Sequence, residues 1–233
     1  MIPTVLTGDE NEALAQINLV QTHAPELDLI QIDVIDGQFA PSLTVGPDDL
    51  IGVDWDNQQI DWHLMSNEVY DQTYDLVGEN KKAWPTRAII AQIEHLDCEP
   101  AAFIDLVAKN EFKPGFSLDL YTPIEEIEPA WFDEGLKIVQ LMAVEAGAQG
   151  QEFNQEIVFT KIAELRELLK ENQLSPAELE LIIDGGIKSE LLPEIIAQTR
   201  DFGQVGLGIG SALWRGNFAE NYQNFSEAIE ACE

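Results

Sequence analysis

Three polar side chains interrupt or end apolar runs at widely separated places in the chain. Asp33 lies inside the segment LIQIDVI, His63 lies inside DWHLM, and Asp184 ends the segment LIID. Two carboxylates and an imidazole are common ligands of divalent metal ions, and two opposed carboxylates can act as general acid and general base. If the fold brings the three together, the sequence predicts a metal site, a proton-transfer site or both.

The apolar runs that carry these residues are predicted β-strands. Several are continuously apolar, which is typical of parallel strands covered on both faces. Within the run that contains Asp33, alternation places Gln31, Asp33 and Ile35 on one face. The predicted strands are residues 2–6, 27–35, 60–65, 88–95, 115–120, 136–144, 179–184 and 203–209.

Between the strands lie stretches whose apolar residues have helical spacing. In residues 156–172, one apolar face is formed by Val158, Ile162, Leu165 and Leu169. We expect Ser189 to cap the start of a later helix, because its hydroxyl can accept a backbone hydrogen bond there. The other predicted helices are residues 10–22, 67–76, 100–110, 124–127, 189–198 and 218–229.

This alternation along an undivided chain predicts an α/β protein, a single (β/α)8 TIM barrel domain over residues 1–233. In such barrels the chemistry sits at the carboxyl ends of the strands, where Asp33, His63 and Asp184 would meet. Each residue alone has an ordinary structural explanation, as a turn residue or a core histidine. Three together favour a functional site, because a barrel mouth otherwise has little reason to bury acids. His95 is expected to end the fourth strand, as a pocket residue or as a hydrogen-bonded core residue.

Glycine-containing segments follow the last three predicted strands, at residues 145–151, 184–187 and 206–211. In this half of a barrel, backbone N–H groups and helix N-termini commonly bind a phosphate. Each segment alone is weak evidence, since glycine is frequent in turns. Their joint placement predicts an anionic, phosphorylated ligand.

Charge and composition exclude several kinds of partner. The 233 residues include 43 Asp or Glu and only 12 Lys or Arg, so the net charge is −31. Such a surface repels nucleic acids and anionic membranes, so we expect neither as a partner. The hydrophobic fraction of 45% predicts a folded chain. The sequence has no signal-like start, no apolar stretch near ~20 residues and only two cysteines, which predicts a cytoplasmic protein.

Several of these segments resemble motifs of the ribulose-phosphate 3-epimerases. Residues 32–47 (IDVIDGQFAPSLTVGP) resemble that family's second-strand signature, HxDxMDGxFVPNxTxGP. Residues 61–65 (DWHLM) are similar to the family's DVHLM, and residues 141–153 are similar to its MxVxPGFGGQxF. The DGGI and GSA segments, at residues 184–187 and 210–212, complete the order. The resemblance spans nearly the whole chain.

The resemblance implies a reaction and a set of site residues. In that family two aspartates act as opposed acid and base at C3 of a ketopentose phosphate, through a metal-stabilised enediolate. By position, Asp33 and Asp184 would be that pair. One divalent ion, Zn, Fe, Mn or Mg, would be held by Asp33, His63, Asp184 and, at the fourth ligand position, Gln31. A small phosphosugar would be bound by Thr4, Met65, Met142, Gly147, Gly150, Gly185, Gly186, Gly210 and Ser211. Family members commonly associate, so a homo-oligomer is a further expectation.

Two departures from the family pattern keep alternatives open. Gln31 replaces a histidine, and an amide oxygen is a poorer ligand than imidazole for zinc or ferrous iron, which favours magnesium or manganese. In the phosphate loop, Ala146, Ala148 and Gln149 replace Pro, Phe and Gly. The leading hypothesis is epimerisation at C3 of a phosphorylated ketose, of the ribulose 5-phosphate to xylulose 5-phosphate type. One alternative is a catalytically weak or inactive paralogue that binds a phosphosugar or a protein partner through the same mouth. Another is a metal-free phosphate-binding barrel with a different reaction.

The charge excess also predicts how stability depends on salt. At ~1 M ionic strength the Debye length falls to ~3 Å, so repulsion among the surplus acids is screened. We therefore expect the thermal unfolding midpoint to rise between low salt and about 1 M NaCl, as measured by circular dichroism. A midpoint that stays constant over this range would contradict the expectation.

Overall fold

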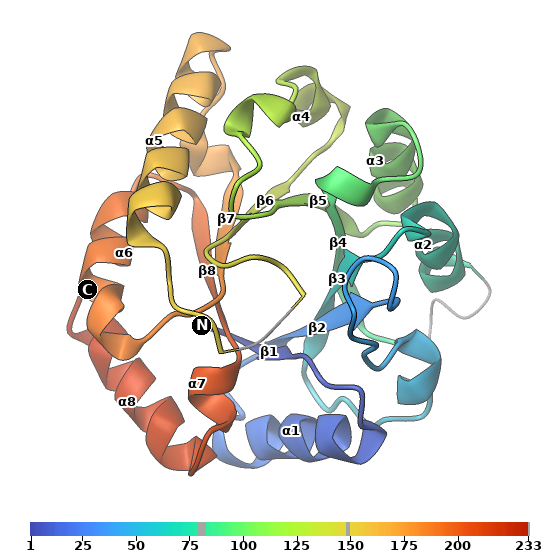
Figure 1. Cartoon of the computed structure of the whole chain (residues 1–233), viewed down its shortest axis with the longest axis vertical. Coiled ribbons are helices and arrows are strands. Elements are labelled where there is room, and N and C mark those ends of the chain that lie inside the picture. Colours follow the sequence, from blue (N-terminus) through green and yellow to red (C-terminus); the bar gives the residue numbers. More distant parts are fainter. Residues whose placement is uncertain (79–82, 148–149, 233) are drawn as a thin grey trace.

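Eight parallel strands form a closed barrel in a computed structural model that describes residues 1–78, 83–147 and 150–232 (Figure 1). Each strand pairs with the next in chain order, and β8 pairs with β1 to close the sheet. The predicted TIM barrel is thus confirmed. The strands are β1 (Ile2–Val5), β2 (Leu29–Ile35), β3 (Gln59–Met65), β4 (Thr86–Gln92), β5 (Lys113–Leu118), β6 (Ile138–Met142), β7 (Glu180–Asp184) and β8 (Gln204–Ile209).

Helices surround the barrel and cover its outer face (Figure 1). Among the described helices, none is long and apolar enough to span a bilayer. The α-helices are α1 (Glu10–His23), α2 (Val69–Val77), α3 (Pro100–Lys109), α4 (Ala130–Glu134), α5 (Gln155–Glu171), α6 (Leu192–Thr199), α7 (Ser211–Trp214) and α8 (Phe218–Glu230). Short 3-10 turns lie at η1 (Pro47–Leu50), η2 (Ile93–His95), η3 (Ile124–Glu126), η4 (Pro176–Glu178) and η5 (Ser189–Leu191).

Side-chain caps fix the start of three of the longer helices. The carboxylate of Asp9 accepts hydrogen bonds from the backbone N–H groups of Asn11 and Glu12 at the start of α1. The side-chain oxygens of Asn154 and Asn217 do the same for α5 and α8. Such caps satisfy backbone donors that have no partner within the helix.

Several expected boundaries differ from the structure, and two of them involve residues named in the sequence analysis. Ser189 begins the 3-10 turn η5, and α6 starts at Leu192 with Pro193 in its first turn. Proline has no N–H and is accommodated where helical N–H groups lack partners anyway, so the α-helix begins beside it. Strand β4 ends at Gln92, and His95 lies exposed in η2, where its Nδ1 is 2.7 Å from Asn67 Oδ1.

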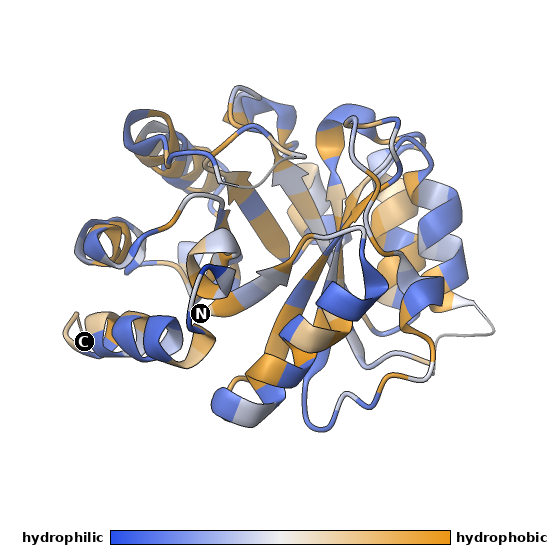
Figure 2. Cartoon of the chain, turned by 60° about the horizontal axis from the view of Figure 1, so that its bottom comes forward, coloured by the Kyte–Doolittle hydropathy of each residue, from blue (hydrophilic) through white to orange (hydrophobic). Residues whose placement is uncertain are grey.

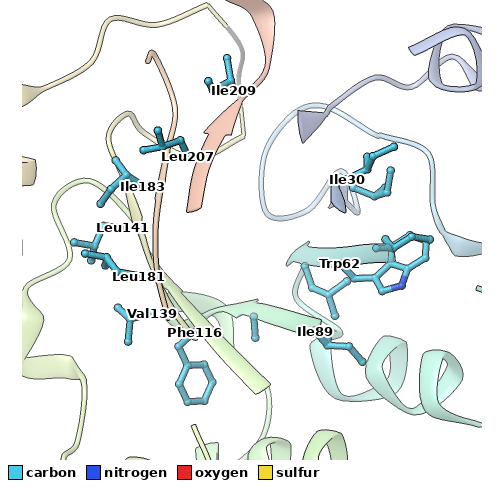
Figure 3. Close-up of a cluster of buried hydrophobic side chains, with 14 of the residues drawn as sticks. Ile30, Trp62, Ile89, Phe116, Val139, Leu141, Leu181, Ile183, Leu207 and Ile209 are labelled. Atoms are coloured by element: carbon cyan, nitrogen blue, oxygen red, sulfur yellow. The ribbon is translucent and has the colours of Figure 1, made fainter. Parts of the chain in front are cut away.

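The larger part of the core lies between the barrel and the helices. Alternate strand residues point outward into this layer, and the strands carry most of the apolar colour in Figure 2. Aromatic rings fill the layer beside β5, where the ring centroids of Phe116 lie 5.3 Å from Phe103 and 5.2 Å from Trp131. Figure 3 shows side chains of this cluster, including Ile30, Trp62, Ile89, Phe116, Val139, Leu141, Leu181, Ile183, Leu207 and Ile209.

A second, smaller apolar cluster is formed by strand residues of the opposite parity, which face the barrel interior. Its members are all buried: Ile2, Leu29, Ala88, Ile90, Ile138 and Ile182. Glycines on the strands leave room for these side chains, since a Cβ added at Gly206 would lie 2.7 Å from Ile2 Cδ1. This packed layer separates the polar residues near the mouth from those at the floor.

The floor of the barrel is closed by an ion-pair network near the amino ends of the strands. Arg87 donates from Nε to Asp61 Oδ1 at 2.8 Å and from Nη1 to Glu180 Oε2 at 2.9 Å. Lys113 Nζ donates to the same oxygen of Glu180 at 2.9 Å. Asp61 is fully buried, and burial raises its pKa although Arg87 opposes the shift. Arg87 is therefore needed to compensate a carboxylate that has no contact with water.

Replacing Arg87 should show how much this network contributes. In Arg87→Met, Asp61 remains buried without its cation, which typically costs about 3–5 kcal/mol in the free energy of unfolding. Urea denaturation of this variant and of Arg200→Met, which removes an exposed arginine, measures the difference. If the two variants lose similar stability, the floor network does not have this role.

Candidate active site

Asp33, His63 and Asp184 come together in the carboxyl-terminal half of the barrel. Asp33 on β2 pairs in register with His63 on β3, and Asp184 is the last residue of β7. All three side chains are buried. One ligand atom from each residue lies within 4.8 Å of the others, which is close enough for all three to contact one divalent ion.

Glycine on the neighbouring strand makes room for Asp184. A Cβ added at Gly208 on β8 would lie 2.7 Å from the carboxyl carbon and Oδ1 of Asp184. Gly186, just beyond β7, has φ +66°, and a Cβ there would lie 2.6 Å from the backbone nitrogen of Phe153. The chain after β7 can therefore approach the β6–α5 segment only because these positions lack side chains.

Two glutamines form hydrogen bonds to the carboxylates. Gln31 Nε2 donates to Asp33 Oδ1 at 2.8 Å and to Asp184 Oδ2 at 2.6 Å. Gln140 Nε2 lies 3.2 Å from both Asp184 Oδ2 and His63 Nδ1. Gln31 was expected to ligate a metal through its amide oxygen; in this arrangement its amide nitrogen bridges the two acids instead.

His63 contacts polar groups through both ring nitrogens. Its Nδ1 lies 3.0 Å from Asp33 Oδ1, and its Nε2 lies 3.0 Å from Gln92 Oε1. When the proton is on Nε2, it is donated to Gln92, and the Nδ1 lone pair faces the carboxylates. That tautomer leaves Nδ1 free to ligate a metal.

Burial and mutual repulsion dominate the electrostatics. Desolvation, followed by the charge of Asp33, raises the pKa of Asp184 to about 7. Burial lowers the pKa of His63, but its hydrogen bond to Asp33 and the charges of Asp33 and Asp184 outweigh burial, so the net pKa is raised. The site thus favours an added positive charge, either a proton or a metal ion.

A cavity of about 470 Å³, which includes space open to solvent, lies above this cluster. All nine residues expected to bind substrate line it, while Gln31 and His63 lie fully buried and are not among its lining residues. Of the three altered loop positions, Ala148 and Gln149 fall outside the described residues. The lining consists of Thr4, Leu6, Asp33, Met65, Met142, Val144, Glu145, Gly147, Gly150, Gln151, Asp184, Gly185, Gly186, Gly210 and Ser211.

The segment after β2 is fixed over one side of the cavity. The carboxylate of Asp36 accepts hydrogen bonds from the backbone of Gln38, Phe39 and Asn67 and from the Ser66 hydroxyl. Burial raises the pKa of Asp36, but these hydrogen bonds outweigh it and hold the pKa below its ordinary value. Further along, the Ser42 hydroxyl donates to the backbone carbonyl of Gly147 at 3.0 Å, which links this segment to the glycine loop after β6.

Sequence reasoning missed Gln92 and Gln140. Both side chains are fully buried and both contact His63. A signal was present for Gln140, because it is an amide within the apolar run IVQLM and has the same parity as Met142. Gln92 was missed because the strand was predicted to end at His95, so attention fell on that residue. In the structure β4 ends at Gln92, three residues earlier.

Comparisons with known proteins agree with the geometry. The sequence model of the ribulose-phosphate 3 epimerase family matches residues 1–213. Ribulose-phosphate 3-epimerase of Bacillus subtilis is 30% identical over 202 residues, covering 83% of this chain and 84% of that protein. The Synechocystis enzyme of the same name is 28% identical over 235 residues, covering 97% of this chain and 90% of that protein.

Similarity to solved structures supports the fold. The crystal structure of 3-keto-L-gulonate-6-phosphate decarboxylase from Vibrio cholerae aligns with a TM-score of 0.59 at 16% identity, covering 100% of this chain and 98% of that one. The likeness at this identity concerns the barrel alone. The family match over residues 1–213, together with the relatives covered over most of their length, establishes that the chain belongs to the ribulose-phosphate 3-epimerase family.

Proposed function

We propose that this protein is a metal-dependent isomerase that epimerises a phosphorylated ketose at C3, of the ribulose 5-phosphate to xylulose 5-phosphate type. The observation that carries the proposal is the pair of buried carboxylates, Asp33 and Asp184. They reach the cavity from strands β2 and β7, and both lie within hydrogen-bond distance of the same Gln31 nitrogen. The names of the curated relatives support the same reaction.

Epimerisation requires one ionised and one protonated carboxyl group at the same time. The ionised carboxylate accepts the proton from C3, and the C–H electron pair enters an enediolate. The protonated carboxyl then returns a proton to the opposite face of C3, which inverts the configuration. Without a bound metal, burial and the charge of Asp33 raise the pKa of Asp184 to about 7, so the metal-free pair holds a shared proton near neutral pH. In the reverse reaction the two groups exchange roles.

The donor atoms of Asp33, His63 and Asp184 fit one divalent ion. When bound, such an ion would act as a Lewis acid that stabilises negative charge on the enediolate oxygens. We propose Gln31 as a further ligand. Its Oε1 is buried without a hydrogen-bond partner among the described residues, and rotation of the amide would direct that oxygen toward the carboxylates.

The glycine-rich segments would bind the substrate phosphate. Gly150, Gly186, Gly210 and Ser211 line the same cavity, where backbone N–H groups can approach an anion without side chains between them. A cation lies beside them, since a Cβ added at Gly150 would lie 2.5 Å from a guanidinium nitrogen of Arg215. In so acidic a protein, Arg215 would supply positive charge that the described cavity-lining residues lack.

A binding-only paralogue is the second candidate. It is favoured by one observation, the Gln31 nitrogen that donates to both acids and so stabilises the pair without a metal. Such a protein would bind a phosphosugar, or a protein partner, through the same mouth and show no turnover. An assay of the purified protein with ribulose 5-phosphate and added divalent ions, coupled to detection of xylulose 5-phosphate, separates the two candidates.

Removing either acid should abolish most of the activity. In Asp33→Asn and Asp184→Asn the proton-transfer group is lost while the shape is kept, and we expect kcat to fall by about 10²–10⁴-fold in each. Turnover in D2O, with deuterium at C3 followed by NMR, measures the proton transfer itself. Asp105→Asn, at an exposed position on α3, is the matched control. Activity in both site variants close to that of the control would exclude the two-acid mechanism.

Arg215 should affect substrate binding more than chemistry. Losing a charge-assisted contact to phosphate costs roughly 1.5–3 kcal/mol, so KM in Arg215→Met should rise about 10–100-fold with little change in kcat. Arg200→Met tests whether loss of any surface cation has the same effect. An unchanged KM in Arg215→Met would show that backbone groups alone bind the phosphate.

A further inference from the structure

Five polar side chains form a closed ring of hydrogen-bond contacts at the site. One of them, Gln140, is assigned a role by neither the motifs nor the family match. Gln31 Nε2 lies 2.8 Å from Asp33 Oδ1 and 2.6 Å from Asp184 Oδ2. Asp33 Oδ1 lies 3.0 Å from His63 Nδ1. Gln140 Nε2 closes the ring, 3.2 Å from both His63 Nδ1 and Asp184 Oδ2. The five residues come from four strands, β2, β3, β6 and β7.

The two amides in this ring share one feature. Within the described part of the chain, Gln31 Oε1 and Gln140 Oε1 are both buried and have no hydrogen-bond partner. Rotating each amide by half a turn about its Cγ–Cδ bond exchanges oxygen and nitrogen and places both oxygens in the ring. Before rotation each amide has one atom without a hydrogen-bond partner, its oxygen. After rotation each amide again has one such atom, its nitrogen, so their number does not rise.

A cation in the ring makes the rotated arrangement favourable. An amide oxygen next to a carboxylate oxygen is repelled unless positive charge lies between them. With a metal in the ring, the two amide oxygens, the two carboxylate oxygens and His63 Nδ1 become five ligands. In a six-coordinate site with bonds near 2.1 Å, neighbouring ligands lie about 3 Å apart. The separations within the ring, 2.6–3.2 Å, fall around that value.

We propose that Gln140 is a fifth protein ligand of the metal and that it adapts the site to a six-coordinate ion such as Mn²⁺; this inference rests on the proposed metal-dependent function. Four oxygens and one imidazole suit manganese. A tetrahedral zinc ion can be satisfied by Asp33, His63, Asp184 and Gln31 without Gln140. Magnesium, which retains most of its water molecules, gains less from so many protein ligands. The sixth position remains for water or a substrate oxygen.

The first test compares metal affinities of the intact protein by isothermal titration calorimetry, with Mn²⁺ and with Zn²⁺. In Gln140→Leu we expect Mn²⁺ affinity to fall about 10–100-fold and Zn²⁺ affinity to change by less than about threefold. Gln140→Glu keeps an oxygen donor and should bind Mn²⁺ at least as tightly as the parent. Gln58→Leu is the matched control, because Gln58 is also buried with an unpartnered Oε1 and is not part of the ring.

A second readout separates a ligand from a residue that only orients His63. When a protein ligand is lost, water takes its place on Mn²⁺, so the water-proton relaxivity of the Gln140→Leu complex should exceed that of the parent complex. A residue acting only through His63 would weaken both metals alike and leave the relaxivity unchanged. Circular dichroism melts of each variant identify any that fails to fold, and Gln140→Glu then provides the comparison.

Three results would overturn the inference: equal Mn²⁺ affinity in Gln140→Leu and the parent, parallel loss of Mn²⁺ and Zn²⁺ affinity, or no binding of Mn²⁺ by the folded parent. None of these measurements uses substrate. Failure of Gln140 as a ligand is therefore distinguishable from failure of the epimerase proposal, which is read from turnover of ribulose 5-phosphate.

Discussion

Repulsion between two buried carboxylates is the constraint around which the site is arranged. Asp33 and Asp184 lie almost out of contact with water, where the charged forms of both are costly. The structure moderates this cost by hydrogen bonds from Gln31 and Gln140 and by the nearby imidazole of His63. In the absence of a metal, the same repulsion raises the pKa of one acid, and it favours the binding of a cation between the two. The proposed acid–base chemistry and the proposed metal binding would thus have a common physical origin.

Much of the fold was predictable because buried parallel strands leave a strong sequence signal. Continuous apolar runs located the eight strands, and their order placed Asp33, His63 and Asp184 at one end of a barrel. The ends of elements were less predictable, since local geometry decides them. Pro193 determines where α6 begins, and the short turn η2 removes His95 from β4.

The least predictable residues of the site were Gln92 and Gln140. Gln140 sits in a run that periodicity identifies only as a buried strand, and nothing local reveals that it faces His63 from the far side of the barrel. That contact depends on the stagger between strands, which the register of β5, β6 and β7 sets. Cross-barrel partners of this kind require the closed sheet before they can be identified.

The strong negative charge of the chain does not prevent binding of an anion at the mouth if the few cations are suitably placed. Arg87 and Lys113 are held at the floor, paired with Asp61 and Glu180, where they stabilise the barrel and cannot reach a ligand at the mouth. At the mouth, Arg215 lies beside Gly150, and in the proposed function this arginine and the backbone N–H groups of the glycine segments would supply the positive potential. An acidic exterior can therefore coexist with a site that accepts an anion.

Gly208 has a consequence for how this barrel can vary. Because a Cβ at position 208 would lie 2.7 Å from the carboxyl group of Asp184, the two positions cannot change independently. Any residue with a side chain at 208 displaces the acid, whereas a shorter residue at 184 would relax the requirement for glycine. Natural variation and laboratory libraries meet the same restriction: position 208 on β8 can accept a side chain only after position 184 on β7 has lost its carboxyl group.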